Sequence, residues 1–116
     1  MENILKRIKE YYPVSEDSLN ALKHCFRQQV FPPKINIIRA GYRDKQVYFI
    51  EKGITRSYIQ YNGKDITTWF SVEGDATCGS WDLYHNKAGF EYVETLEETL
   101  TYAIPIEKLN GLYKSR

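Results

Sequence analysis

The chain has 116 residues, of which 42% are hydrophobic and 27% charged, so it has room for one globular domain. A formal net charge of +1 gives no overall basic excess of the kind that dedicated nucleic-acid-binding domains use to hold phosphates. Cys25 and Cys78 form no C-x-x-C pair and the N-terminus has no apolar signal core, so we expect a cytoplasmic protein with reduced thiols. No apolar run approaches the roughly 18 residues of a membrane span, so we expect no membrane contact. Aromatic residues, at 15% of the chain, are the unusual part of the composition.

The spacing of apolar residues predicts two helices at the N-terminus. The first begins near Ile4, and Pro13 should end it at or just before Tyr12. Ser15 is a good N-cap for a second helix, which should end near Cys25.

From Arg27 onward the pattern changes to short β-strands separated by turn residues. The strongest local signal is Asn62-Gly63 between two β-rich runs, which is the preferred sequence of a tight type I′ hairpin turn. Pro105 should begin a short helix that carries Leu109 and Leu112. The absence of a βαβ rhythm favours an antiparallel sandwich, a jelly roll or a small barrel. The predicted strands are 28–31, 34–38, 46–50, 54–61, 64–70, 91–96 and 100–104.

Few residues are available for catalysis or for binding a metal. His24 and His85 are the only histidines, so the chain cannot supply the three-histidine site typical of metal-binding jelly rolls. Cys78, Asp82 and His85 leave a mixed metal site or a cysteine–histidine pair open, although a partly buried thiol is the simpler interpretation of Cys78. Glycine-rich phosphate-binding loops are absent. We therefore expect no enzyme and no cofactor, and what remains is the binding of a small molecule by aromatic and polar side chains.

The order and spacing of glycines resemble those of cyclic-nucleotide-binding domains, and in particular those of bacterial Crp/Fnr-type transcriptional regulators. The resemblance covers nearly the whole chain. It implies a mainly β fold, a double-stranded β-helix or jelly roll with short flanking helices at both ends, that senses a small-molecule effector. The matching residues are Ala40-Gly41, Val47-Tyr48-Phe49-Ile50, Gly53, Gly63, Gly74-Asp75 and Gly79.

The resemblance also implies a phosphate-binding cassette, which in this chain would begin at Cys78. In members that respond to cyclic nucleotides, an arginine of the cassette binds the cyclic phosphate and a glutamate holds the ribose hydroxyl. Gly79 and Leu83 match the cassette, but Ser80 replaces the glutamate and Gly89 stands at the position of the arginine. Loss of the arginine should weaken binding by about two orders of magnitude. We therefore expect the chain not to bind cAMP.

The aromatic residues near this cassette suggest a pocket remade for a neutral or aromatic ligand, although the same rings could simply fill the cavity. Glu91, at a position where the family has a small alanine, adds negative charge nearby. The candidate ligand-binding residues are Cys78, Gly79, Ser80, Trp81, Leu83, Gly89, Phe90, Tyr92 and Trp69.

The resemblance predicts one sensor domain spanning residues 1–116, without a helix-turn-helix domain, so that this chain alone should not bind DNA. It leaves a homodimer open. The main alternative is a β-sandwich protein-interaction module with a closed pocket, which a filled interior and an exposed aromatic patch would favour. A metal enzyme of the cupin type, with a metal near Cys78 and His85, is the third possibility.

Overall fold

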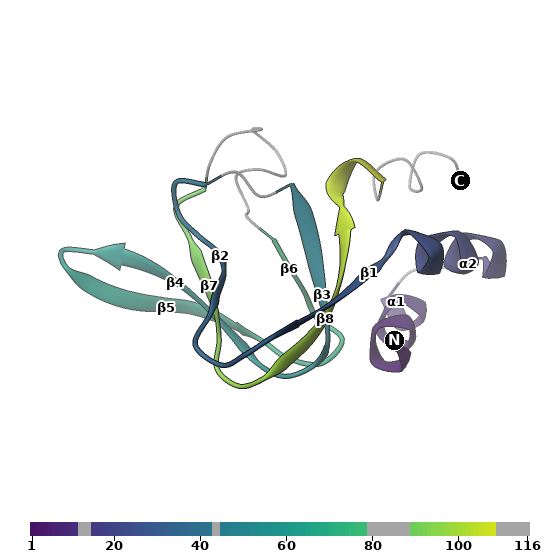
Figure 1. Ribbon diagram of the computed structural model, residues 1–116, viewed down its shortest axis with the longest axis horizontal. Helices are drawn as coiled ribbons and strands as arrows, with labels where there is room; N and C mark the ends of the chain where they lie inside the picture. The colour runs from purple at the N-terminus through teal and green to yellow at the C-terminus, as the bar shows by residue number, and fades with distance from the viewer. Residues whose placement is uncertain (12–14, 43–44, 79–88, 109–116) are drawn as a thin grey trace.

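The computed structural model describes residues 1–11, 15–42, 45–78 and 89–108, in which two helices precede eight strands (Figure 1). The strands form two antiparallel sheets, ordered β1-β8-β3-β6 and β2-β7-β4-β5, that face each other as in a jelly roll. The predicted mainly β fold is therefore confirmed. The elements are α1 (Glu2–Tyr11), α2 (Glu16–Cys25), β1 (Arg27–Phe31), β2 (Asn36–Ile38), β3 (Gln46–Lys52), β4 (Thr55–Tyr61), β5 (Lys64–Ser71), β6 (Ala76–Thr77), β7 (Tyr92–Thr95) and β8 (Thr99–Pro105).

The predicted hairpin joins β4 and β5 through Asn62 and Gly63. Their φ angles of 51° and 77° lie in the left-handed region, as a type I′ turn requires of both central residues. Asparagine and glycine reach this region at low cost, which is why this pair marks the turn in the sequence.

Two details of the chain differ from the sequence prediction. The two-residue strand β6 was not predicted, because a segment this short has no recognisable alternation. Pro105 ends β8, where it lies opposite Gln46, and the helical residues begin at Ile106 rather than at Pro105. Leu109 and Leu112 lie outside the described residues.

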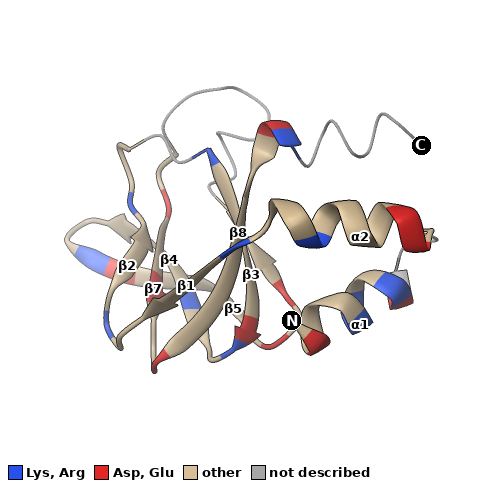
Figure 2. Ribbon diagram, turned by 45° about the vertical axis from the view of Figure 1, so that its right-hand side comes forward, with Lys and Arg blue, Asp and Glu red and all other residues tan. Residues whose placement is uncertain are grey.

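The two helices lie side by side next to the β1-β8-β3-β6 sheet (Figure 2). The Ser15 hydroxyl accepts a hydrogen bond from the backbone N–H of Ser18 and caps α2. Leu22 of α2 packs against Val47 of β3 and Ile104 of β8, so this sheet is covered on its helix side as well as on its inner side. Both helices have acidic residues in the first turn and basic residues in the last, as the helix dipole favours (Figure 2). None of the described helices is long and apolar enough to span a membrane.

A bulge in β3 fixes α1 to the sheet. The ladder between β3 and β8 shifts register between Ile50 and Lys52, which sets Glu51 apart from the regular pairing. The two carboxylate oxygens of Glu51 accept hydrogen bonds from the backbone N–H groups of Asn3 and Ile4, at 3.1 and 3.2 Å. These N–H groups have no partner within the helix, so Glu51 caps α1 from outside.

The interior between the sheets is partly apolar and partly lined by hydroxyl groups. Ile38, Tyr48, Val93 and Ala103 belong to one cluster of buried residues that contains side chains from both sheets. All seven buried polar residues in the described part of the chain are threonine or serine: Thr55, Ser57, Ser71, Thr77, Thr95, Thr99 and Thr101.

Candidate functional site

The register of the β2-β7-β4-β5 sheet determines which of its side chains face the interior. Thr55 and Ser57 of β4 are buried and lie directly opposite Thr95 and Val93 of β7. Successive side chains of a strand point to opposite faces, so Arg56 lies on the outer face of the sheet. The inner face of β4 therefore offers hydroxyl groups rather than large apolar side chains.

Trp69 of β5 lies on the same inner face of the sheet as Thr55 and Ser57. It lies opposite Ser57 in the β4–β5 ladder, and yet it is 68% exposed whereas Ser57 is 7% exposed. The difference arises because β5 is an edge strand of a hairpin that projects from the body of the molecule (Figure 1). An accessible indole beside a hydroxyl-lined surface can stack on a planar ligand.

A bulge in β5 adds a carboxylate to this inner surface. The β4–β5 ladder shifts register between Ser57 and Tyr58, and Thr68 is the extra residue on β5. The Thr68 hydroxyl oxygen lies 3.1 Å from the Ser57 carbonyl oxygen and 3.1 Å from Oε2 of Glu91. Its single proton serves one of these acceptors at a time. The half-buried Glu91 carboxylate is thereby held next to the residue that precedes Trp69.

The described part of the predicted ligand-binding set is divided among different surfaces. Trp69 lies on the inner face of its sheet, whereas Tyr92 stacks on Tyr58, with ring centroids 5.1 Å apart, on the outer face. Cys78 packs against the cluster under the helices, and Phe90 is 55% exposed. The Gly89 carbonyl oxygen accepts a hydrogen bond from the backbone N–H of Gly41. The predicted residues Gly79, Ser80, Trp81 and Leu83 lie outside the described residues.

A metal site is not found in the part of the chain that the structure describes. No group of three or more histidine, cysteine, aspartate or glutamate residues there could hold a metal ion. Asp82 and His85, two of the three residues considered for a mixed site with Cys78, lie outside the described residues.

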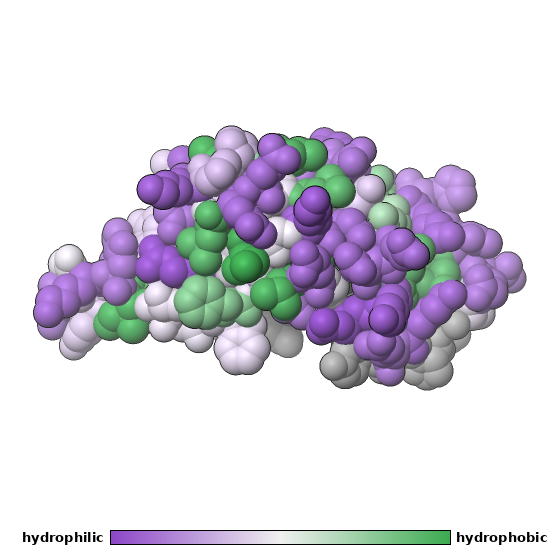
Figure 3. Space-filling model, turned by 90° about the horizontal axis from the view of Figure 1, so that it is seen from below, coloured by the Kyte–Doolittle hydropathy of each residue, from purple (hydrophilic) through white to green (hydrophobic). Residues whose placement is uncertain are grey.

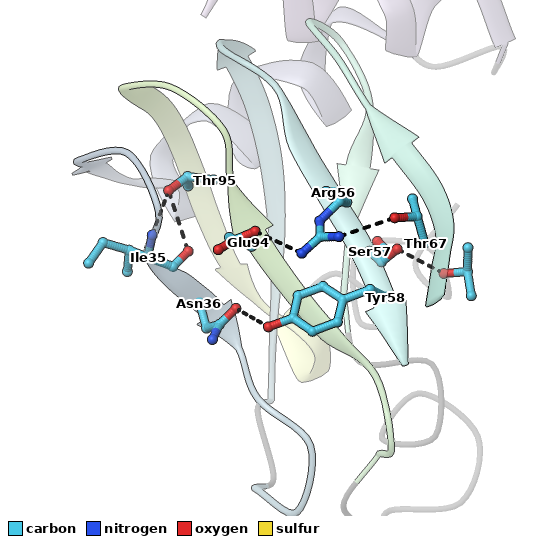
Figure 4. Close-up of polar contacts among 9 residues, drawn as sticks. Ile35, Asn36, Arg56, Ser57, Tyr58, Thr67, Glu94 and Thr95 are labelled. Carbon is cyan, nitrogen blue, oxygen red and sulfur yellow. Dashed lines mark hydrogen bonds and ion pairs between the residues drawn. The ribbon is translucent and has the colours of Figure 1, made fainter. Parts of the chain in front are cut away.

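The outer face of the same sheet carries a network of polar contacts that crosses its four strands (Figure 4). The Arg56 guanidinium donates to Oε1 of Glu94 on β7 at 3.1 Å and to the Thr67 hydroxyl on β5 at 3.2 Å. The Tyr58 hydroxyl donates to Oδ1 of Asn36 on β2 at 3.2 Å. These contacts join neighbouring strands through their side chains in addition to the backbone ladder.

Tyr58 lies at the centre of this network, and it is buried although it belongs to the outer face. The Arg56 guanidinium carbon lies 4.3 Å from the centre of its ring, and Tyr92 stacks on it. Burial raises the pKa of the Tyr58 phenol, and the nearby Glu94 carboxylate acts in the same direction. Tyr58 is therefore a neutral hydrogen-bond donor at physiological pH.

Sequence reasoning did not find Thr68 or the outer network. A bulge has no reliable signature in a run such as Thr67-Thr68, and without it the Glu91 contact cannot be foreseen. The alternation of Arg56 and Tyr58 with Thr55 and Ser57 was the available signal for two different faces of β4.

No protein-family model matches the sequence, and no curated protein matches it. Solved structures do match the fold. The regulatory domain of Toxoplasma gondii PKA, crystallised with cAMP, has a TM-score of 0.84 at 16% identity, over 96% of this chain and 43% of that one. The Thermus thermophilus catabolite activator protein has a TM-score of 0.79 at 16% identity, over 90% of this chain and 49% of its own.

A third solved structure is a mutant regulatory subunit of a cAMP-independent protein kinase A from Trypanosoma brucei, bound to cAMP in the A site. It has a TM-score of 0.79 at 18% identity, over 98% of this chain and 44% of that one. The chain thus spans less than half the length of these three proteins. At these identities the likeness concerns the fold, and the two sheets with their flanking helices are the jelly roll of cyclic-nucleotide-binding domains.

Proposed function

We propose that the chain is a small-molecule effector-sensing domain, resembling that of Crp/Fnr-type regulators, whose altered phosphate-binding cassette does not bind cAMP. The observation that carries the proposal is the Glu91 carboxylate, held 3.1 Å from the Thr68 hydroxyl beside the inner face of β4. The fold shared with a PKA regulatory domain crystallised with cAMP supports a ligand-binding role for this chain.

Two changes act against an anionic ligand. Gly89 stands where the resemblance places the arginine that binds the phosphate, so a charge-assisted pair is missing. Glu91 places a negative charge two residues away, and like charges repel more strongly in a partly buried site than in water. Both effects lower the affinity for a cyclic phosphate.

One of the solved structures that match this fold comes from a protein described as independent of cAMP. The Trypanosoma brucei kinase subunit is described as cAMP-independent, and the cAMP-bound form that matches here is a triple mutant. This supports the proposal that residue changes, rather than changes of fold, decide whether cAMP binds.

The described inner surface suits a neutral, planar ligand with hydrogen-bonding groups. Trp69 offers a ring for stacking, and Ser57 and Thr68 offer hydroxyl groups beside it.

A panel of neutral aromatic compounds and cyclic nucleotides, measured by calorimetry on the 116-residue chain, tests this. We expect saturable binding by members of the neutral class and at least about tenfold weaker binding in Trp69→Ala, the loss of one stacking contact. Phe70→Ala, on the opposite face of β5, is the matched control and should retain affinity. The absence of saturable binding, or equal effects of both variants, would contradict the proposal.

We further propose that residues 1–116 act as one domain that does not recognise a DNA sequence by itself. The net charge of +1 supports this, since specific DNA binding draws on many phosphate contacts. A gel-shift titration should show no specific complex, and a specific complex would overturn the statement.

A second candidate function, protein interaction, is favoured by the exposed apolar side chains of β5. Ile66, Trp69 and Phe70 are 44%, 68% and 54% exposed, and Figure 3 shows apolar surface on the hairpin and continuing toward the middle of the molecule. An edge strand with exposed apolar side chains can pair with the same strand of a second copy. Sedimentation equilibrium should then show a dimer that Ile66→Lys dissociates. A wild-type monomer at the highest soluble concentration would reject this candidate.

A further inference from the structure

A row of three hydroxyl side chains crosses the inner face of the β2-β7-β4-β5 sheet. Thr55 of β4 lies directly opposite Ser71 of β5 on one side and Thr95 of β7 on the other. Ser71 is 3% exposed, and Thr55 and Thr95 are fully buried. Three adjacent hydroxyl groups are therefore shielded from bulk water. Each of them needs a hydrogen-bond partner inside the protein.

Thr95 has its partners within the chain. Its hydroxyl lies 2.7 Å from the Pro32 carbonyl oxygen, to which it donates, and it accepts from the backbone N–H of Ile35 at 3.0 Å. Thr99 and Thr101, on the facing sheet, donate to the backbone carbonyl oxygens of Glu97 and Gln29. The buried threonines around Thr55 are thus tied to nearby backbone.

Thr55 differs from its neighbours. Its Oγ1 is the one buried side-chain nitrogen or oxygen in the described part of the chain that has no hydrogen-bond partner. A buried hydroxyl left in this state costs free energy, since both its proton and its lone pairs lose the hydrogen bonds that water supplied. Native proteins satisfy such groups with protein atoms or with ordered water.

The interior layer that contains Thr55 has short hydroxyl side chains from both sheets. Sheets of a sandwich lie about 10 Å apart, and here Ser71, Thr55 and Thr95 contribute short side chains from one sheet while Thr99 and Thr101 contribute short side chains from the other. Isoleucine and leucine usually fill such a layer, so this one is unusually rich in hydroxyl groups. Buried water occurs about once per 27 residues in globular proteins and typically makes about three hydrogen bonds to polar groups.

We propose that Thr55 binds an internal water molecule between the two sheets, with Ser71 as a neighbouring hydroxyl partner. The water accepts a hydrogen bond from the Thr55 hydroxyl and donates one to a hydroxyl or carbonyl oxygen of the same layer. Thr55 lies on the same face of β4 as Ser57, two residues away, so this water is the next polar group beneath the surface that Ser57 and Trp69 form. The inference is independent of any effector, because it depends only on the buried hydroxyl groups.

A crystal structure of the wild-type 116-residue chain, at a resolution that shows ordered water, is the direct test. We expect a water molecule within 2.5–3.2 Å, the ordinary hydrogen-bond range, of Thr55 Oγ1. A structure in which Oγ1 instead bonds to a protein atom, or faces an empty space, would overturn the proposal.

Thermal unfolding of Thr55 variants gives a second test. The sign of the change in Tm distinguishes a Thr55 hydroxyl that is bonded to water from one that has no partner. Thr55→Val keeps the shape of the side chain and removes the hydroxyl, so it should lower Tm by about 4 °C if a hydrogen bond to water is lost. Thr55→Ser keeps the hydroxyl and should lower Tm less. Thr101→Val, which removes a bond to a known protein acceptor, is the matched control and should also lower Tm. A rise in Tm for Thr55→Val, the effect of removing an unpaired hydroxyl, would contradict the proposal.

Discussion

The Thr68 hydroxyl and the Glu91 carboxylate lie 3.1 Å apart, although β4 separates β5 from β7, the strand that follows Glu91. The contact spans β4 because the bulge at Thr68 adds a residue to β5. A local irregularity of the edge strand therefore fixes a negative charge next to the inner surface that Ser57 and Trp69 form.

An arginine side chain at position 89, together with removal of the Glu91 carboxylate, should create affinity for cAMP. Gly89→Arg combined with Glu91→Ala should bind cAMP at least about a hundredfold more tightly than the wild type, measured by calorimetry. Gly89→Arg alone should gain less, because Glu91 would pair with the new guanidinium. Equal gains in both variants would show that Glu91 does not face the anion.

The Arg56 network should contribute measurably to stability. Replacement of Arg56 by methionine removes the Glu94 pair and the Thr67 contact and should lower the free energy of unfolding by about 1–2 kcal/mol, as urea titration measures it. The matched control is Lys9→Met, which breaks a well-exposed pair with Glu16 at 3.8 Å. That change should cost less than about 0.5 kcal/mol. Similar losses in the two variants would mean that the network adds nothing beyond a surface ion pair.

Glu51 should hold α1 against the sheet. Glu51→Ala leaves the N–H groups of Asn3 and Ile4 without their acceptor and should cost about 1–2 kcal/mol. Amide hydrogen exchange in α1 should become faster while exchange in β8 changes less, since the helix loosens before the sheet. Glu98→Ala, at an exposed carboxylate, is the control. Unchanged protection of α1 in Glu51→Ala would contradict the capping role.

Two glycines with positive φ should respond differently to alanine. A Cβ at Gly53 would lie 2.8 Å from the Cα of Thr99, so Gly53→Ala combines a clash with an unfavourable φ of 121° and should cost about 3 kcal/mol. A Cβ at Gly63 meets nothing within 4 Å, so Gly63→Ala should cost about 1 kcal/mol from its φ alone. Equal losses in urea unfolding would show that the contact between Gly53 and Thr99 is not tight.

Tyr58 should make stability depend on alkaline pH. Burial raises the pKa of its phenol in the folded state, so the unfolded chain releases the proton first as pH rises. The contribution of Tyr58 is fully present below the ordinary tyrosine pKa, near 10, and is lost as pH rises through the folded-state pKa. The difference in unfolding free energy between wild type and Tyr58→Phe should therefore shrink as pH increases above about 10. A difference that is constant with pH would refute the burial of this phenol.

The sequence predicted most of the elements, although not β6 or the end of β8 at Pro105, and it did not predict the contacts between them. Asn62-Gly63, Ser15 and the change from helical to β-rich patterning at Arg27 predicted the hairpin, the second helix and the start of the strands, because each depends on local backbone preferences. The separation of Trp69 from Tyr92 onto different faces depends on strand register. The Thr68 bulge and the Glu51 cap depend on residues far apart in the chain, and no local pattern encodes them.

The central claim is that this fold is retained in a chain that does not recognise cAMP, and calorimetric titration of the wild-type 116 residues with cAMP tests it most directly. The Gly89→Arg, Glu91→Ala variant, purified and titrated in the same way, is the positive control for cAMP binding. We predict no saturable heat from the wild type, with measurable binding by the variant. Saturable binding of cAMP by the wild type with a Kd of about 1 μM or tighter, a free energy near −8 kcal/mol, would contradict the account.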